Sequence, residues 1–205
     1  MRKAIAILVV LSLVAFGGQV AVNLDPTPND GDMLQYDNGT PKWVVWGGTY
    51  RGVWFNVQDF IPGALDGYLE QAEFWFYHSD NYPWDTSDVY LEIWNGDVNG
   101  PTSQIDQQMV TALDYLPVYG TYTGESCTVE QNFWAMANME MSSGGWPSLI
   151  SDWEGSAVAH SFLSDDLIVW EPWEYDGLLC NWYIRVEWNP LSFENSTWGS
   201  LKATF

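Results

Sequence analysis

Basic residues are scarce in this chain. Its 205 residues include six Lys and Arg against 27 Asp and Glu, so the formal net charge at pH 7 is −21. A surface this acidic repels phosphate backbones and anionic lipid headgroups. The composition therefore excludes nucleic acid as a partner. The acidity itself is either that of a solvated surface or that of carboxylates which bind Ca²⁺.

Cysteine and histidine are also rare, with two of each. The four residues lie far apart in the sequence, so no spacing typical of a zinc site is present. In an exported chain, a pair of cysteines is expected to be bridged. We predict a disulfide between Cys127 and Cys180, each at the start of a predicted strand. Two buried thiols are the alternative.

Long hydrophobic runs are absent except at the N-terminus. Two basic residues precede the apolar run Ala4–Phe16, and two glycines follow it. This order is typical of a secretory signal peptide, and the run is too short to span a bilayer comfortably. We predict a signal peptide at residues 1–18, an extended linker at 19–32, and a secreted or cell-surface location. An uncleaved N-terminal anchor is the alternative.

The chain beyond residue 32 lacks the 3.6-residue apolar period of helices, apart from one possible short helix at Pro147–Trp153. Apolar and polar residues instead alternate, as in Gly67–Tyr77 and Asp88–Trp94. Such alternation predicts half-buried strands, and turn residues recur at the spacing of a β-sandwich. We predict an all-β fold, an antiparallel, jelly-roll-like sandwich over residues 33–188, followed by a C-terminal tail at 189–205.

Two further features refine this prediction. The alternating runs within residues 130–188 are expected to be central strands of the sandwich. Residues 95–103 contain many Gly, Asn and Asp, so they predict a loop. The tail either packs on the domain as an edge strand or serves as a recognition tag.

Tryptophan is abundant, with 14 residues, which is more than a core of this size requires. Flat rings with a polar edge stack on sugars and anchor protein interfaces. Those on predicted strands are assigned to the core, together with the phenylalanines nearby: Trp54, Phe74, Phe76 and Trp134. The tryptophans in or beside predicted loops are candidate ligand-binding residues: Trp84, Trp146, Trp153, Trp170 and Trp173. The alternative is that these rings close the ends of the sandwich.

Acidic turns suggest a site for Ca²⁺, which prefers carboxylate and carbonyl oxygens. Asp97 and Asn99 are the best candidate ligands, followed by Asp165 and Asp166. None of these turns matches a full EF-hand loop. The alternative is that the four residues are ordinary turn formers.

No catalytic signature is present. The sequence has no Gly-x-Ser-x-Gly elbow and no phosphate-binding glycine loop. Four glutamates lie near tryptophans, as a glycoside hydrolase would need, but 27 acidic residues produce such neighbours by chance. They are Glu140, Glu154, Glu171 and Glu174. We predict that the chain is not an enzyme, and we keep a glycoside hydrolase as the least favoured alternative.

The order of strand and turn motifs from residue 33 to residue 205 resembles a loose set of uncharacterised modules in exported bacterial proteins. These modules are jelly-roll-like β-sandwiches, similar in appearance to carbohydrate-binding modules. The motifs that carry the resemblance are Tyr36–Gly39, Val53–Val57, Glu73–Tyr77, Val89–Trp94, Asn99–Pro101, Phe133–Met136, Gly144–Ser148, His160–Phe162 and Asn181–Val186.

The resemblance implies a non-catalytic module that binds carbohydrate or a cell surface. Its expected partners are polysaccharide or other surface proteins. A structural subunit of an extracellular layer or filament is the alternative function.

Overall fold

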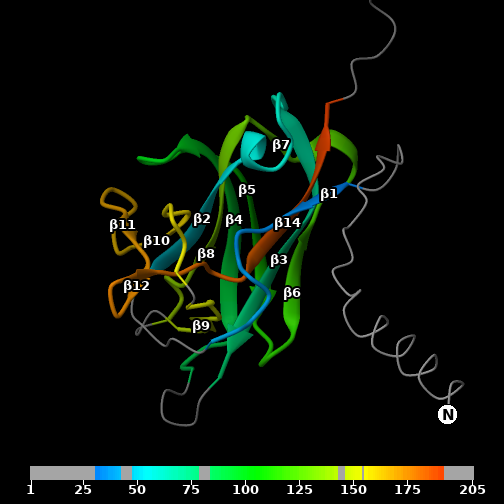
Figure 1. Ribbon diagram of the computed structural model, residues 1–205. Helices are drawn as coiled ribbons and strands as arrows, with labels where there is room; N and C mark the ends of the chain where they lie inside the picture. The colour runs from blue at the N-terminus through cyan, green and yellow to red at the C-terminus, as the bar shows by residue number, and fades with distance from the viewer. Residues whose placement is uncertain (1–30, 43–47, 79–83, 143–145, 154, 192–205) are drawn as a thin grey trace, which may run out of the picture. The chain divides into compact units, whose positions relative to one another are not determined.

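The computed structural model describes residues 31–42, 48–78, 84–142, 146–153 and 155–191. Two antiparallel sheets face each other as two layers, which confirms the predicted all-β sandwich (Figure 1). The predicted signal peptide lies outside the described residues, as does the tail beyond residue 191. Within the described residues, no helix is long and apolar enough to cross a membrane.

The first sheet is built around a long strand that matches its predicted bounds, β3 at Gly67–Tyr77. Its main path has the order β1-β14-β3-β6, and two short strands, β7 and β9, pair with the ends of β3. The other bounds are β1 Asp32–Leu34, β14 Ile184–Pro190, β6 Pro117–Thr121, β7 Thr128–Val129 and β9 Ser148–Leu149. Strand β9 replaces the possible helix at Pro147–Trp153.

The second sheet has the order β11-β10-β2-β8-β4-β5. Its bounds are β11 Glu171–Pro172, β10 Ser161–Ser164, β2 Tyr50–Asn56, β8 Asn132–Asn138, β4 Asp88–Asp97 and β5 Gly100–Thr111. Strands β12 (Glu174–Tyr175) and β13 (Leu178–Leu179) form a separate ribbon. The 3₁₀ turns η1 and η2 span Val57–Asp59 and Gly124–Ser126. Strands β8 and β14 each lie between two others, as expected for residues 130–188.

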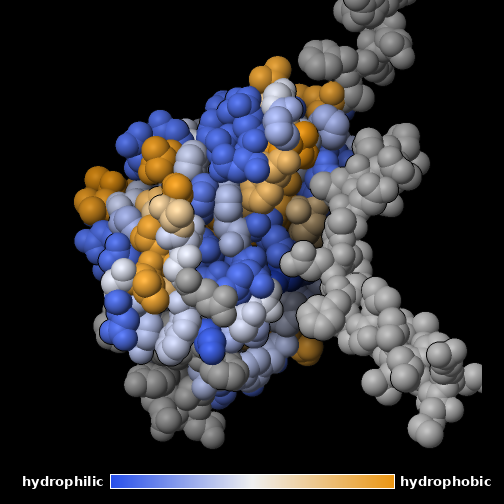
Figure 2. All heavy atoms as spheres, viewed as in Figure 1, coloured by the Kyte–Doolittle hydropathy of each residue, from blue (hydrophilic) through white to orange (hydrophobic). Residues whose placement is uncertain are grey.

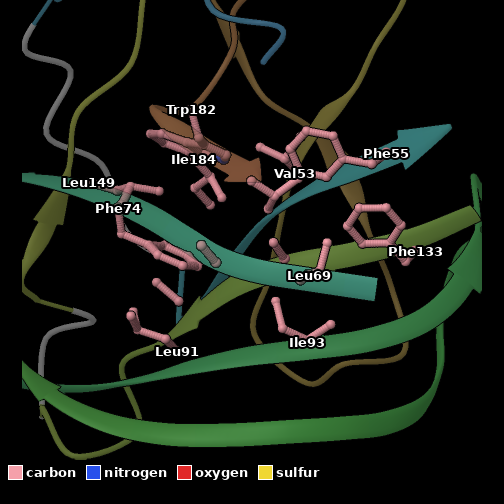
Figure 3. Close-up of a cluster of buried hydrophobic side chains, with 14 of the residues drawn as sticks. Val53, Phe55, Leu69, Phe74, Leu91, Ile93, Phe133, Leu149, Trp182 and Ile184 are labelled. Carbon is pink, nitrogen blue, oxygen red and sulfur yellow. The ribbon is translucent and has the colours of Figure 1, made fainter. Parts of the chain in front are cut away.

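The core fills the space between the sheets. Alternation along β2 and β4 directs Val53, Phe55, Leu91 and Ile93 inward, where they meet Phe74 of β3 (Figure 3). These side chains are fully buried. Burial of this apolar surface is the main favourable term in the stability of the sandwich.

One ion pair links β14 to the segment between β1 and β2. The Arg185 Nη2 and Nε atoms donate to the two carboxylate oxygens of Asp37 at 2.8 and 2.9 Å. The Asp37 side chain is completely buried, and Arg185 is 19% exposed. Glu73 of β3 adds a longer contact of 3.4 Å to Arg185. The fork geometry is that of a strong, charge-assisted pair.

The predicted disulfide is not formed, because Cys127 and Cys180 are both buried free thiols. Each is held by a different neighbour. The carbonyl of Cys127 accepts from Leu69 N of β3, whereas the Cys180 thiol donates to the Leu178 carbonyl. Burial raises the pKa of Cys127 to about 12 and also raises that of Cys180, so both thiols are protonated at neutral pH.

Candidate binding site on the outer face of the second sheet

Three tryptophans lie side by side across the second sheet. Trp54 of β2 is paired with Trp134 of β8, which is paired with Trp94 of β4. Because Val53 and Phe55 point into the core, alternation directs Trp54 and its partners to the outer face. Trp134 is fully buried, as predicted for a core residue, but on this outer face, and Trp54 is only half-buried there. Phe74 and Phe76 lie in the core between the sheets, as predicted.

Trp134 is buried although it faces outward. Its ring lies over Gly52, where an added Cβ would be 3.1 Å from Trp134 Cε3. The rings of Phe162 and Trp170 pack against it at centroid distances of 5.2 and 4.8 Å. Its indole nitrogen donates to the Asp97 carbonyl at 2.9 Å. Trp134 thus lies between the sheet and Trp170, so Trp134 is buried and Trp170 stays half-buried.

A pocket of about 330 Å³ opens beside Trp170, between the β4–β5 hairpin and the β10–β11 turn. We call it the Trp170 pocket. The predicted loop at residues 95–103 is in fact a tight hairpin, with only Val98 and Asn99 between the two strands. Gly100 allows the ring to come close, since a Cβ there would lie 3.0 Å from Trp170 Cδ1. The lining residues are Asp97, Asn99, Gly100, Pro101, Thr102, Leu167, Ile168 and Trp170.

The lining brings together residues that the sequence assigns to separate sites. Asp97 and Asn99 are predicted calcium ligands, and Trp170 is a predicted ligand-binding ring. They are about 70 residues apart in the chain, and β2 and β8 lie between their strands in the sheet. They meet over Trp134 of β8, which donates to the Asp97 carbonyl and packs against Trp170. No sequence signal identified this meeting, because it depends on strand order.

Of the four candidate calcium ligands, the three aspartates serve as turn or loop acceptors, and Asn99 donates to Asp97. Asp97 Oδ1 accepts from Asn99 N at 2.8 Å, and Asp165 Oδ1 accepts from Thr49 N at 3.1 Å. Asp166 Oδ1 accepts from the backbone of Val169 and Ile168, and these bonds lower the pKa of Asp166. In the part of the chain that the structure describes, no three His, Cys, Asp or Glu side chains are grouped to hold a metal ion. Binding of Ca²⁺ stays a prediction.

None of the other four candidate tryptophans lines the Trp170 pocket. Trp173 is buried in the core and stacks on Trp182 at 4.5 Å, so its prediction as an accessible binding ring is wrong. Trp84 packs against the core, and Trp146 is half-buried. Trp153 is exposed, and it stacks on Tyr175 with the Lys42 ammonium 5.1 Å from its ring centre.

Among the described residues, the lining of the Trp170 pocket contains one carboxylate, Asp97. A glycoside hydrolase needs two carboxyl groups across the scissile bond. Of the four glutamates considered above, Glu140 accepts from the Tyr50 hydroxyl, Glu171 and Glu174 are exposed on β11 and β12, and Glu154 lies outside the described residues. The described lining of this pocket therefore lacks the carboxylate pair that a glycoside hydrolase needs.

His160 lies next to the same face, stacked between two rings. Its centroid is 3.5 Å from Tyr36 and 5.4 Å from Trp54. Asp59 accepts from the Tyr36 hydroxyl at 2.7 Å and lies 3.9 Å from His160 Nε2. Burial is the largest influence on His160 and lowers its pKa, outweighing the Trp54 carbonyl and Asp59, which raise it.

We expect His160 to make the fold less stable in mild acid. Because its pKa is lower in the folded chain than the unfolded value of 6.5, the unfolded chain binds the proton more readily. The free energy of unfolding should fall as pH drops below 6.5 and stop falling below the folded pKa. Urea denaturation between pH 8 and pH 5 measures this slope. His160→Phe, which keeps the stacked ring, should flatten it; an unchanged slope in that variant would contradict the assignment.

No family model, curated protein or solved structure matches this chain.

Proposed function

We propose that this chain is an exported, non-catalytic module that binds polysaccharide at a cell surface or in the extracellular medium. The Trp170 pocket is the binding site in this proposal. The observation that carries it is the placement of a half-buried tryptophan ring beside Asp97 and Asn99 in one open pocket.

The chemistry of the pocket supports a sugar ligand. An indole ring offers a flat apolar surface to the C–H face of a pyranose, while carboxylate and amide groups accept and donate hydrogen bonds to its hydroxyls. The volume of about 330 Å³ is at the small end of ligand pockets, which suits a short segment of a chain. Trp134 packs against the Trp170 ring, and the Trp170 indole nitrogen donates to the Leu167 carbonyl at 3.3 Å, so little conformational entropy is lost on binding.

An assembly subunit is the second candidate, because the turn beside the pocket is strongly apolar. Ile168 is 79% exposed and Val169 is 58% exposed. Figure 2 shows apolar, orange residues next to blue ones on the side where β10 and β11 lie. Exposed apolar groups of this kind can mark contacts between proteins. Light scattering after size exclusion distinguishes the two functions by the molar mass of the protein in solution. Wild-type oligomers that dissociate in the Ile168→Ser variant would favour assembly, and a monomeric wild-type protein would contradict it.

The polysaccharide proposal is tested by electrophoresis of the folded chain in native gels that contain single polysaccharides of neutral, acidic and amino types. Each gel is run with Ca²⁺ and with EDTA. We expect retardation by at least one polysaccharide. The proposal fails if no polysaccharide retards the protein and if no insoluble polysaccharide, at millimolar sugar concentration, pulls the protein down. A retardation that EDTA removes would support the predicted use of Ca²⁺.

A further inference from the structure

A second pocket, of about 280 Å³, lies away from the Trp170 pocket and shares no lining residue with it. It is formed by the segment between β1 and β2, by the segment after β9, and by the residue that precedes Trp182. We call it the Asp152 pocket. Its lining residues are Tyr36, Asn38, Asp152, Gly155, Ser156 and Asn181.

The carboxylate of Asp152 is fixed and almost fully buried, with 2% of the residue exposed. Its Oδ1 accepts from Asn181 N at 2.7 Å. Its Oδ2 accepts from Asn38 N at 3.1 Å and from Asn181 Nδ2 at 3.4 Å. No Lys, Arg or His among the described residues forms an ion pair with it. The described part of the pocket thus holds a buried carboxylate that has hydrogen bonds but no cationic side chain paired with it.

Asn181 provides a second, independent observation that points to a ligand. It is 5% exposed, and its Oδ1 has no hydrogen-bond partner among the residues that the structure describes. The orientation of the amide is set by its other end, because Nδ2 donates to Asp152 and a flipped amide would place two acceptors together. A buried acceptor without a donor is costly and rare in native proteins.

We propose that the Asp152 pocket binds a primary ammonium group, carried either by an amino sugar or by a lysine side chain of a partner protein. An ammonium has three donors and no acceptor, so it matches the orphan Asn181 oxygen and the carboxylate together. It also supplies the positive charge that a buried carboxylate lacks, which a neutral hydroxyl does not.

The surroundings favour an ammonium over other cations. Ca²⁺ takes six to eight oxygen ligands, usually with several carboxylates, and Asp152 is the only carboxylate among the described residues of the lining. The nearby base Arg185 is already engaged by Asp37 and Glu73. The pKa of Asp152 is raised, because burial and the neighbouring Asp37 outweigh the hydrogen bonds that lower it. A bound cation would stabilise the ionised carboxylate and so offset the effects of burial and of Asp37.

The test compares three ligands that share one ring, by calorimetric titration of the folded chain at pH 7.5. Glucosamine carries the ammonium, glucose has a hydroxyl in its place, and N-acetylglucosamine has a neutral amide. We expect glucosamine to bind at least tenfold more tightly than the other two. A lysine derivative with both termini blocked distinguishes the sources, because binding of this probe alone would assign the pocket to a protein partner. Equal affinities for all three sugars and no lysine binding would overturn the proposal.

Asn38 allows a variant that blocks the pocket without disturbing its buried groups, because its side chain is exposed and only its backbone N–H contacts Asp152. Asn38→Lys supplies a tethered ammonium and should weaken amine binding at least tenfold. Thr40→Lys adds the same charge on an exposed neighbour and should leave amine binding unchanged. Equal losses in both variants would assign the binding to general charge attraction and overturn the site.

This site is independent of the proposed polysaccharide site. Trp170→Ala should leave glucosamine binding intact, because Trp170 does not line the Asp152 pocket. Loss of polysaccharide binding and loss of amine binding are therefore distinguishable outcomes. Amine binding that disappears in Trp170→Ala would contradict the placement at Asp152.

Discussion

Replacing Arg185 with Met is expected to lower the free energy of unfolding by about 3–5 kcal/mol, because it leaves the Asp37 carboxylate buried without its cation. The Asp37 side chain has no exposed surface and receives two donors from the guanidinium. Met retains much of the apolar length of Arg, so the loss reports on the charge and its hydrogen bonds. Urea denaturation at pH 7 measures the change.

Glu73→Gln is the matched control for this pair. Its contact with Arg185 is longer, at 3.4 Å, and Gln keeps an acceptor for the Trp75 indole N–H. We expect it to cost less than about 1 kcal/mol. Adding Asp37→Asn to Arg185→Met should recover part of the stability, since the unpaired charge is then gone. A loss below about 1 kcal/mol in Arg185→Met would contradict the account of the ion pair.

Trp182→Ala is expected to cost about 3–5 kcal/mol as well, through a cavity in the core. The ring stacks on Trp173 at 4.5 Å, and the Arg51 guanidinium lies 5.8 Å from its centre. Its indole nitrogen donates to the Phe162 carbonyl at 3.1 Å, so the substitution also removes a buried hydrogen bond. Chemical denaturation gives the size of the loss, and near-ultraviolet circular dichroism follows the stacked rings.

Trp153→Ala provides the comparison, because it removes the same side chain from an exposed position. Trp153 is 42% exposed and contacts Tyr175 and Lys42 at the surface. We expect a loss of about 1 kcal/mol or less. Similar losses for the two tryptophans would mean that Trp182 is not a core residue of the kind described above.

The strand pattern could be predicted from the sequence because alternation depends only on neighbouring residues. Residues 67–77 became β3 with the bounds that alternation gave. Alternation does not show which face of a strand points into the core. Trp54 and Trp134 alternate like core residues, but their neighbours Val53 and Phe133 occupy the core, and rings from other strands bury Trp134 from outside.

The candidate site depended on contacts between distant segments, which periodicity does not contain. The tight β4–β5 hairpin brought Asp97 and Asn99 to Trp170, where the sequence had predicted a longer loop. The orphan oxygen of Asn181 could not be anticipated either, because it is defined by the position of Asp152, 29 residues earlier. The disulfide could not be judged from the sequence for the same reason. Cys127 is bonded through its carbonyl to β3, whereas the Cys180 thiol donates to the Leu178 carbonyl, and both thiols are free.

In the proposed function, the Trp170 ring is the contact surface for polysaccharide. The most direct measurement is calorimetric titration of Trp170→Ala with the polysaccharide that retards the wild-type protein most. Tyr119→Ala, an exposed aromatic on β6 of the other sheet, serves as the control. We predict a loss of affinity of tenfold or more for Trp170→Ala, equivalent to about 1.4 kcal/mol, and no change for Tyr119→Ala. Unchanged affinity in a folded Trp170→Ala would contradict the account.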